Sequence, residues 1–373
     1  MPSLNFLICT GIYPPEIGGP ATVVAKLVTD LKQAGHKVHV LTYGDEDANA
    51  NGVTHISRKR LLPFRYLSFA SAVRRHLEPE TIVFSTDVFS TGIPVRLALI
   101  GTRNRLFIRL GGEWCWEDAV TKGRFYGTLR VFWARPRISL RDRLMRANYR
   151  WTLMRASRIY LTADFLKEIV ARIVPRAEGR MSVVQNRAGQ PSPLHMQGGD
   201  DKPHKPLHLL YVGRFAPVKN VPFLARVIKR LHDESVPIVA TFAGSGPDEA
   251  EVKKILAGVP RISLLGNLPS SELSKLYGEA DIFVLPSLSD ICPNAVLEAL
   301  AAGVPCIITS EHGLGRLGGV VEVDPTDEKA WTDVLKRFAD VRLYDELRTK
   351  IAYQSSAGQN LSHAFLRDAE ATS

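Results

Sequence analysis

One stretch, residues 280–310, constrains the fold more than any other part of the chain. It holds an apolar run at 282–285, which predicts a buried parallel strand, and a second apolar run at 304–309. Between them, 293–302 begins with proline and is followed by Gly303, a pattern typical of a helix. In a strand–loop–helix–strand unit, the loop and the helix start lie at the carboxyl edge of a parallel sheet. Folds of this class bind ligands at that edge.

The same alternation runs through the rest of the chain and predicts a doubly wound α/β fold. Further strands are expected at 4–9, 37–41, 53–57, 81–85, 105–109, 158–161, 181–184, 207–212, 237–243, 261–265 and 320–323. Helices are expected at 66–77, 93–100, 125–133, 140–154, 163–173, 272–277, 327–338, 344–353 and 362–370, and two more end near 34 and 231. A stretch rich in Gly and Pro places a linker at 189–206, between domains at 1–188 and 207–359.

Length and composition narrow the class of protein. The 373 residues suggest about two domains, and the chain has no apolar run long enough to span a membrane. The N-terminal residues form an expected strand without a charged leader, so no signal peptide is predicted. The four cysteines are far apart and lack metal-ligand spacing, which favours reduced thiols in a cytoplasmic protein.

The helix start near 294 is expected to bind an anion. The amides of Asn294, Ala295 and Val296 have no partners inside the predicted helix and lie at the positive end of its dipole. Glu298 lies one turn further in and Asp290 lies in the loop, where carboxylates favour hydroxyl groups over phosphate. Two carboxylates beside a phosphate-binding helix suit a nucleotide that carries a sugar.

These residues together resemble the signature of retaining glycosyltransferases of the GT-B fold, family four. In that pattern a carboxylate is followed by seven residues and a glutamate, within Pro-Ser-x-x-Glu-Gly-Phe-Pro-x-x-x-x-Glu-Ala-x-Ala-x-Gly-x-Pro. The chain has Pro286, Ser287, Pro293, Glu298, Ala299, Ala301, Gly303 and Pro305 in place. It departs at Asp290, Ile291 and Cys292, in the loop expected to contact the donor sugar. The alternative is an ordinary helix packed on a sheet.

The resemblance implies a fold and a reaction. Two Rossmann-like domains are expected to face a central cleft, the first for the acceptor and the second for the nucleotide sugar. A final helix at about 360–373 is expected to pack back on the first domain. The implied reaction moves a sugar from a UDP- or GDP-sugar to a hydroxyl of a sugar or lipid-linked acceptor, with retained configuration. No metal or other cofactor is expected, and cell-surface polysaccharide or glycolipid synthesis is the implied context.

Further motifs match the same family. Arg214 and Lys219 flank a strand-to-helix turn in the spacing of its diphosphate clamp, where Arg offers a planar fork and Lys a compact charge. Gly18 and Gly19 resemble its N-terminal glycine loop beside the donor diphosphate. The alternatives are two solvated charges and a plain tight turn.

Two positions near the expected strand at 261–265 concern the base of the nucleotide. Leu265 and Asn267 are expected to border that base. The Gly-rich segment 311–315 is expected to be a mobile loop.

Glu113 is the candidate carboxylate for the acceptor hydroxyl. Many family members place a histidine in this region, but the chain has none between His76 and His195. Gly-Gly-Glu-Trp-Cys-Trp-Glu instead resembles a branch with Gly-Asp or Gly-Glu before Trp-Glu, so Glu113 could orient or deprotonate the hydroxyl, with Glu117 second. The alternatives are that Glu117 caps a helix or pairs with an arginine, and that Glu113 is merely exposed.

The formal charge of +10 is concentrated at 122–158, which holds eleven Lys or Arg and one acid, Asp142. A solvated helical face with Trp133 and Trp151 in the core is one interpretation. Nucleic acid is disfavoured because no recognised nucleic-acid module accompanies the charge. Docking on the anionic inner face of a membrane is the third interpretation.

Three other functions remain open. An inactive nucleotide-sugar-binding subunit would explain Asp290 and the missing histidine. A nucleotide-sugar epimerase could use the same fold. A nucleotide-dependent oxidoreductase is disfavoured because the Gly-x-Gly-x-x-Gly fingerprint is absent.

Overall fold

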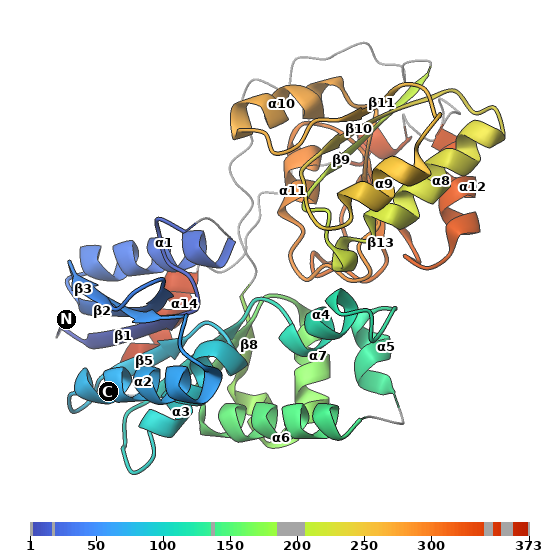
Figure 1. Ribbon diagram of the computed structural model, residues 1–373. Coiled ribbons are helices and arrows are strands. Elements are labelled where there is room, and N and C mark those ends of the chain that lie inside the picture. Colours follow the sequence, from blue (N-terminus) through green and yellow to red (C-terminus); the bar gives the residue numbers. More distant parts are fainter. Residues whose placement is uncertain are drawn as a thin grey trace. The chain divides into compact units, whose positions relative to one another are not determined.

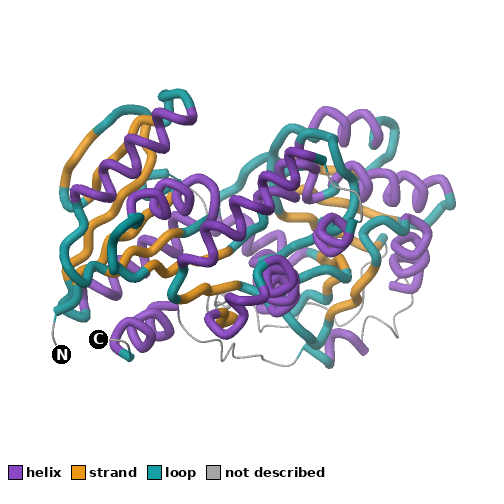
Figure 2. Tube along the Cα trace, turned by 90° about the horizontal axis from the view of Figure 1, so that it is seen from below, coloured by secondary structure: helices purple, strands orange, loops and turns teal. Residues whose placement is uncertain are grey.

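The computed structural model describes residues 3–16, 19–135, 139–184, 206–338, 346–351 and 361–371. The chain divides into two compact units. The first comprises Met1–Cys115, Pro136–Asn186 and Gly358–Ser373, and the second comprises Trp116–Arg135 and Arg187–Ala357. Strands and helices alternate along the chain, and in each unit the helices lie around a sheet (Figures 1 and 2).

The first unit is built on an eight-stranded sheet in the order β3-β4-β2-β1-β5-β6-β7-β8. Its strands are β1 (Asn5–Thr10), β2 (Lys37–Gly44), β3 (Ala48–Ala50), β4 (Val53–Ser57), β5 (Ile82–Ser85), β6 (Leu106–Leu110), β7 (Arg158–Leu161) and β8 (Met181–Val183). Neighbouring strands are parallel, except that β3 pairs antiparallel with β4. Phe6 of β1 pairs with Val38 of β2 and with Ile82 of β5, so apolar side chains of three strands share one core.

Helices cover both faces of this sheet (Figure 1). The structure has α1 (Gly19–Gln33), α2 (Leu62–Arg75), η1 (Val88–Gly92), α3 (Ile93–Ala98), α6 (Leu140–Arg155), α7 (Asp164–Ile173), η2 (Pro175–Arg180) and α14 (Leu361–Glu370). The last helix, α14, packs against α1 and places Phe365 against Phe6, Phe84 and Phe107. The end of the chain therefore completes the core of the first unit.

The second unit holds a six-stranded parallel sheet in the order β11-β10-β9-β12-β13-β14. Its strands are β9 (Leu207–Val212), β10 (Ile238–Ala243), β11 (Ile262–Leu264), β12 (Ile282–Leu285), β13 (Cys306–Thr309) and β14 (Val320–Val323). Its helices are α5 (Leu129–Ala134), η4 (Pro217–Lys219), α8 (Val221–Asp233), α9 (Glu249–Ile255), α10 (Ser270–Glu279), α11 (Asn294–Ala301) and α12 (Glu328–Phe338), and most of α4 (Trp114–Thr121) belongs to it. Buried side chains such as Phe223 of α8 and Trp331 of α12 meet in its core.

Most predicted elements are present, and the differences are local. β3, α4 and α9 were not predicted, and α2 begins at Leu62, four residues earlier than expected. The predicted linker at 189–206 lies outside the described residues apart from Pro206, so the domain boundaries stay a prediction. Among the helices that the structure describes, none has both the length and the apolar character needed to cross a membrane.

Candidate functional site

The predicted donor-site residues of the second unit lie near the carboxyl edge of its sheet, where β9 and β12 are neighbours. From β9 the chain adds β10 and β11 on one side, whereas β12, β13 and β14 extend the sheet on the other side. The strand order therefore reverses between β9 and β12, and open α/β sheets bind ligands beside such a reversal. Arg214 and Lys219 follow β9, and Asp290 follows β12.

The loop after β9 holds its shape through two hydrogen bonds. Burial, and then nearby Asp290, raises the pKa of Tyr211, so its hydroxyl stays protonated and donates to the carbonyl of Arg214 at 2.9 Å. Asn220 adopts the left-handed conformation (φ 56°), and its amide Nδ2 donates to the carbonyl of Pro325 at 2.9 Å. The side chain of Arg214 is exposed, and the two hydrogen bonds hold the backbone of the loop that carries it.

Lys219 and Asp290, two residues predicted for the site, lie in direct contact. Nζ of Lys219 donates to Oδ2 of Asp290 at 2.5 Å, and the side chains are 23% and 7% exposed. The hydroxyl of Ser287 donates to the same carboxylate oxygen at 3.1 Å. The two donors converge on one carboxylate oxygen of Asp290, so Lys219 and Ser287 together hold this side chain in place.

The loop that carries Asp290 is held on both sides. The amide of Asp290 donates to the carbonyl of Glu311, and the carbonyl of Asp290 accepts from the amide of Gly313. Earlier in the same loop, the amide of Leu288 donates to the carbonyl of Val218. The expectation that 311–315 is a mobile loop is therefore wrong for its first residues, because they pair with Asp290 through main-chain hydrogen bonds.

Glu311 and Ser289 are functional candidates that the sequence did not indicate. Glu311 is buried (6% exposed), and its carboxylate accepts from the hydroxyl of Ser289 and from the amide of Arg130 at 2.9 Å. Ser289 in turn accepts from the amide of Leu129 at 2.8 Å. The amides of Leu129 and Arg130 are the first two of α5, and the first amides of a helix have no partner inside the helix. The two side chains thus fasten α5 to the loops after β12 and β13.

The start of α11 differs from the expected anion site in one respect. Pro293 precedes the helix, which begins at Asn294, and a tight turn directs two of the three amides to nearby carbonyls. The amide of Asn294 donates to the carbonyl of Cys292 at 3.0 Å, and the amide of Val296 donates to the carbonyl of Pro293 at 3.1 Å. A phosphate would compete with these turns, so Asn294, Ala295 and Val296 do not form a fully open cradle.

Glu298, one turn into α11, is exposed and oriented by a tyrosine. The buried hydroxyl of Tyr277, on α10, donates to Oε2 of Glu298 at 3.0 Å. Burial, and then the Glu298 carboxylate, raises the pKa of Tyr277, so this donor keeps its proton. The carboxylate is fixed at the surface, where hydroxyl groups of a ligand could donate to it.

Leu265 and Asn267 lie at the carboxyl end of β11, and both are exposed. Between them, the carbonyl of Gly266 accepts from the amide of Gly244 at 2.6 Å. Gly244 has a φ of +135°, and a Cβ at this position would lie 2.0 Å from the carbonyl oxygen of Gly213. Only glycine lets these strand-end loops approach so closely.

The predicted residues of the first unit are less well defined. Gly18 lies outside the described residues, and Gly19 begins α1. Glu113 is 1% exposed, beside Cys115 and near Tyr149, and its Oε1 accepts from the amide of Cys115 at 3.2 Å. The interpretation of Glu113 as merely exposed is wrong, because its carboxylate caps the first turn of α4. Glu117 is half-buried and also makes contacts.

The basic window at 122–158 is divided between the two units. Residues up to Arg135 belong to the second unit, whereas α6 belongs to the first. Within the second unit, Lys122 and Arg124 both pair with Asp118. Trp151 is 37% exposed, so it does not lie in the core.

Comparison with known families decides the class of protein. Residues 206–340 match the family described as "Glycosyl transferases group 1", and residues 18–187 match the "Glycosyl transferase 4-like domain". The chain belongs to the group 1 glycosyltransferases. This glycosyltransferase resembles sucrose-phosphate synthase from Thermosynechococcus elongatus, with a TM-score of 0.72 and 18% identity over 99% of this chain and 100% of the other. The predicted GT-B class, with two Rossmann-like domains, is confirmed.

Two curated relatives of this glycosyltransferase illustrate the range of the family. It is 32% identical over 148 residues to the sulfoquinovosyl transferase SQD2 of Arabidopsis thaliana, and the aligned stretch covers 40% of this chain and 27% of the relative. It is 23% identical over 333 residues to the alpha-monoglucosyldiacylglycerol synthase of Streptococcus pneumoniae, covering 83% and 71%. The first match spans less than a third of the relative's length.

Proposed function

We propose that this glycosyltransferase takes its sugar from a nucleoside-diphosphate sugar, a UDP- or GDP-sugar, bound at the strand reversal of the second unit. One observation carries the proposal: Lys219 and Asp290 meet at 2.5 Å where the strand order reverses, a few residues from the exposed Arg214. A base and an acid in this position suit the two parts of such a donor, the diphosphate and the sugar.

The positive groups would stabilise the leaving diphosphate. As the bond between the anomeric carbon and the β-phosphate oxygen breaks, its electron pair moves to the diphosphate. Arg214 offers a fork of donors to phosphate oxygens and Lys219 offers a compact charge. Charge that develops in the transition state is where such groups contribute most to rate. The proposed reaction therefore needs no metal ion, because these two side chains supply the positive charge.

The carboxylates would position hydroxyl groups. Glu298, oriented by Tyr277, is proposed to accept from the ribose hydroxyls, and Asp290 from hydroxyls of the donor sugar. Leu265 and Asn267, at the end of β11, are proposed to border the base. In the proposed retaining step, the acceptor oxygen attacks the anomeric carbon from the face that the diphosphate leaves, and its proton passes to the departing phosphate oxygen.

The acceptor is proposed to be a hydroxyl of a sugar or of a lipid-linked saccharide, in the synthesis of a cell-surface polysaccharide or glycolipid. Relatives named for glycolipid and teichuronic acid synthesis support this class. Glu113 remains the proposed acceptor-side carboxylate, although its burial means that it must become accessible first. The enzyme is proposed to work at the inner face of a membrane.

A thermal-shift panel of UDP-, GDP- and ADP-sugars tests donor binding, because a ligand that binds only the folded protein raises its melting temperature. The donor that gives a shift is then used to compare turnover of Arg214→Ala with that of the wild type. A loss of more than tenfold is expected, and Lys254→Ala, which removes an exposed base of α9, serves as the control.

The same assay separates the alternative functions. Turnover equal to wild type in Arg214→Ala would refute the proposed clamp. Donor binding without transfer would indicate a binding subunit, and release of an altered free nucleotide sugar would indicate an epimerase.

A further inference from the structure

One face of the first unit combines exposed apolar side chains with a dense positive charge. Helices α2, α3 and α6 lie side by side on the side of the sheet opposite α1 (Figure 1). Nη1 of Arg74 on α2 donates to the carbonyl of Ala98 on α3 at 2.6 Å. The guanidinium of Arg96 on α3 stacks 4.7 Å from the ring centre of Trp151 on α6. The three helices therefore form one surface, called here the α2–α3–α6 face.

The apolar side chains of this face are concentrated at the start of α2. Leu61, Leu62, Phe64 and Leu67 are each more than half exposed. In a soluble domain, single exposed apolar residues are common, but four within seven positions form a patch. Such a patch indicates a surface that is covered in use.

The other two helices of the face also carry exposed apolar side chains. Leu97 and Ile100, at the end of α3, are exposed, and so are Leu140, Leu144 and Trp151 on α6. With Met154, also exposed on α6, the face carries ten of the fourteen large apolar side chains that are exposed in the described residues. The second unit, by contrast, has three, which include Leu265 at the candidate donor site.

The charge of the face is almost entirely positive. Residues 58–76 hold six Lys or Arg and no acid, residues 93–105 hold three and no acid, and residues 139–158 hold six and one acid, Asp142. The chain as a whole has 48 bases and 38 acids, so the rest of it carries more acids than bases. The excess positive charge of the protein therefore lies in these three segments.

Some bases of this face pair with acids, and others bond to main-chain carbonyls. Arg58, Arg60 and Arg158 do pair with acids elsewhere in the first unit. Arg74 and Arg155, however, bond to main-chain carbonyls, which orient a guanidinium without neutralising it. The face is thus an extended positive surface that also holds protruding apolar groups.

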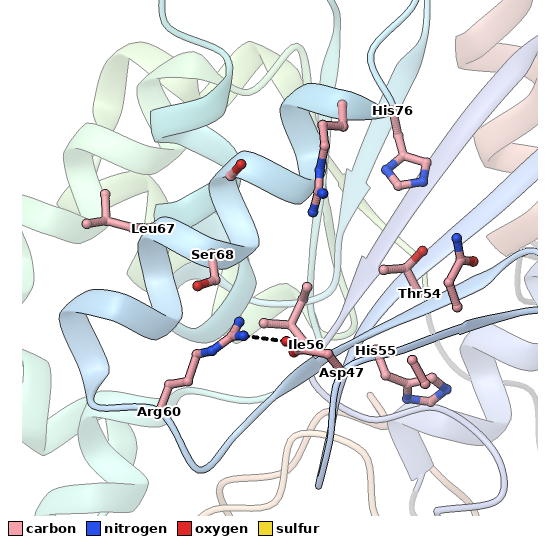
Figure 3. A pocket seen from close by; sticks show the side chains of 12 residues that line it. Asp47, Thr54, His55, Ile56, Arg60, Leu67, Ser68 and His76 are labelled. Atoms are coloured by element: carbon pink, nitrogen blue, oxygen red, sulfur yellow. Dashed lines mark hydrogen bonds and ion pairs between the residues drawn. The ribbon is translucent and has the colours of Figure 1, made fainter.

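A cavity beside α2 adds donors for phosphate oxygens (Figure 3). It measures about 960 Å³ and lies between α2 and the strands β3 and β4. Its lining includes Ser68, Arg75 and His76, with Leu67 from the apolar patch. Arg60 also lines it but is paired with Asp47 of the same lining (Figure 3). Polar donors therefore lie along the same helix as the apolar side chains.

We infer that the α2–α3–α6 face docks on an anionic phospholipid bilayer. Leucine and phenylalanine side chains gain by burial at the boundary of headgroups and acyl chains, while Lys and Arg attract anionic headgroups. A nucleic acid would engage the charge but would leave the aliphatic side chains in water, so it fits the face less well. The inference rests on the proposed function and deepens it, since it gives the lipid-linked acceptor a surface. Of the expected docking region 122–158 it keeps α6, and it adds α2 and α3.

The test is co-sedimentation of the full chain with phosphatidylcholine vesicles, with and without phosphatidylglycerol, at low and high salt. The charge variant is Arg75→Glu, Arg103→Glu and Arg143→Glu, one exposed base from each segment. Because each base contributes roughly fivefold to binding near such a surface, its vesicle affinity should fall at least about a hundredfold. The control variant, Lys254→Glu, Lys275→Glu and Lys329→Glu, makes the same charge change in the second unit and should bind as the wild type does.

The apolar variant, Phe64→Ser with Leu144→Ser, separates a bilayer from a soluble polyanion. Both side chains are exposed, so the fold should tolerate the change, and circular dichroism checks this for every variant. Its binding should fall several-fold at either salt concentration. No wild-type binding at low salt, or equal losses in the charge and control variants, would overturn the inference. Unchanged binding of the apolar variant would indicate a polyanion instead.

Donor binding is measured on the same samples by thermal shift with the nucleotide sugar. Variants that lose vesicles should keep their donor shift, because the substituted residues lie in the first unit. Vesicle binding without any donor shift would refute the proposed function alone, and a donor shift without vesicle binding would refute the docking face alone.

Discussion

Replacing Lys219 by methionine should destabilise the second unit, because it leaves the carboxylate of Asp290 buried without its cation. That carboxylate is 7% exposed, and only the hydroxyl of Ser287, at 3.1 Å, would remain as its side-chain donor among the described residues. Removing one partner of a fully buried pair costs about 3–5 kcal/mol. Lys219 is 23% exposed, so solvent screens part of this cost, and we expect a loss of about 2–3 kcal/mol in the free energy of unfolding.

A double-mutant cycle gives the coupling between the two residues. Asp290→Asn removes the charge and should partly rescue Lys219→Met, so the double variant should be more stable than the sum of the single changes by at least about 1 kcal/mol. The assay is urea unfolding read by hydrogen exchange of peptides that contain β9 and β12, which assigns the loss to the second unit.

An exposed pair serves as the control for this cycle. Lys229 and Asp233, on α8, are 48% and 56% exposed, and Lys229→Met should cost less than about 0.5 kcal/mol. Additive losses at Lys219 and Asp290, or equal losses at Lys219 and Lys229, would refute the reasoning that the 2.5 Å contact is a buried ion pair.

Three further predictions follow from single contacts. Glu298→Gln should weaken binding of free nucleoside diphosphate, whereas Asp290→Asn should weaken the intact sugar donor more than the nucleoside diphosphate; calorimetry showing equal losses for both ligands would contradict this division. Burial, then neighbouring His76 and Lys32, lowers the pKa of His39 from an ordinary 6.5 to about 4, so the unfolded chain takes up a proton that the folded chain does not. The contribution of His39 to the free energy of unfolding should therefore be fully present above pH 6.5 and be lost as the pH falls from 6.5 to 4. His39→Gln should flatten that part of the pH profile. Gly244→Ala should destabilise by more than about 3 kcal/mol or prevent folding, because its Cβ would meet the carbonyl oxygen of Gly213 at 2.0 Å. Gly258→Ala, also at a positive φ but facing open space, should cost only about 1 kcal/mol, and thermal melts compare the two.

Much of the fold could be predicted because its signals are local. The apolar run at 282–285, the proline before α11 and the glycine after it indicate β12, α11 and β13 without any knowledge of tertiary contacts. The missed elements have weak local signals. β3 is three exposed residues, and α9 is a seven-residue helix, too short for a clear apolar period.

The site was predicted in its members but not in its contacts. Motif spacing selected Lys219 and Asp290, yet their ion pair depends on β9 lying beside β12, which periodicity does not determine. Glu311 and Ser289 were missed because their importance arises from the start of α5, more than 150 residues away in sequence. The amides of Asn294 and Val296 were expected to be open, but the turn at Pro293 supplies acceptors that the sequence does not reveal.

The central claim, that the second unit binds the nucleotide part of the donor at its strand reversal, is tested most directly by hydrogen exchange. The full chain is compared with and without saturating UDP, GDP or ADP. For one of these nucleotides, we expect slower exchange in peptides that cover 213–220 and 286–298, and unchanged exchange in β1 and β5 of the first unit. Protection confined to the first unit, or no protection at 213–220 and 286–298 with any of the three nucleotides, would contradict it.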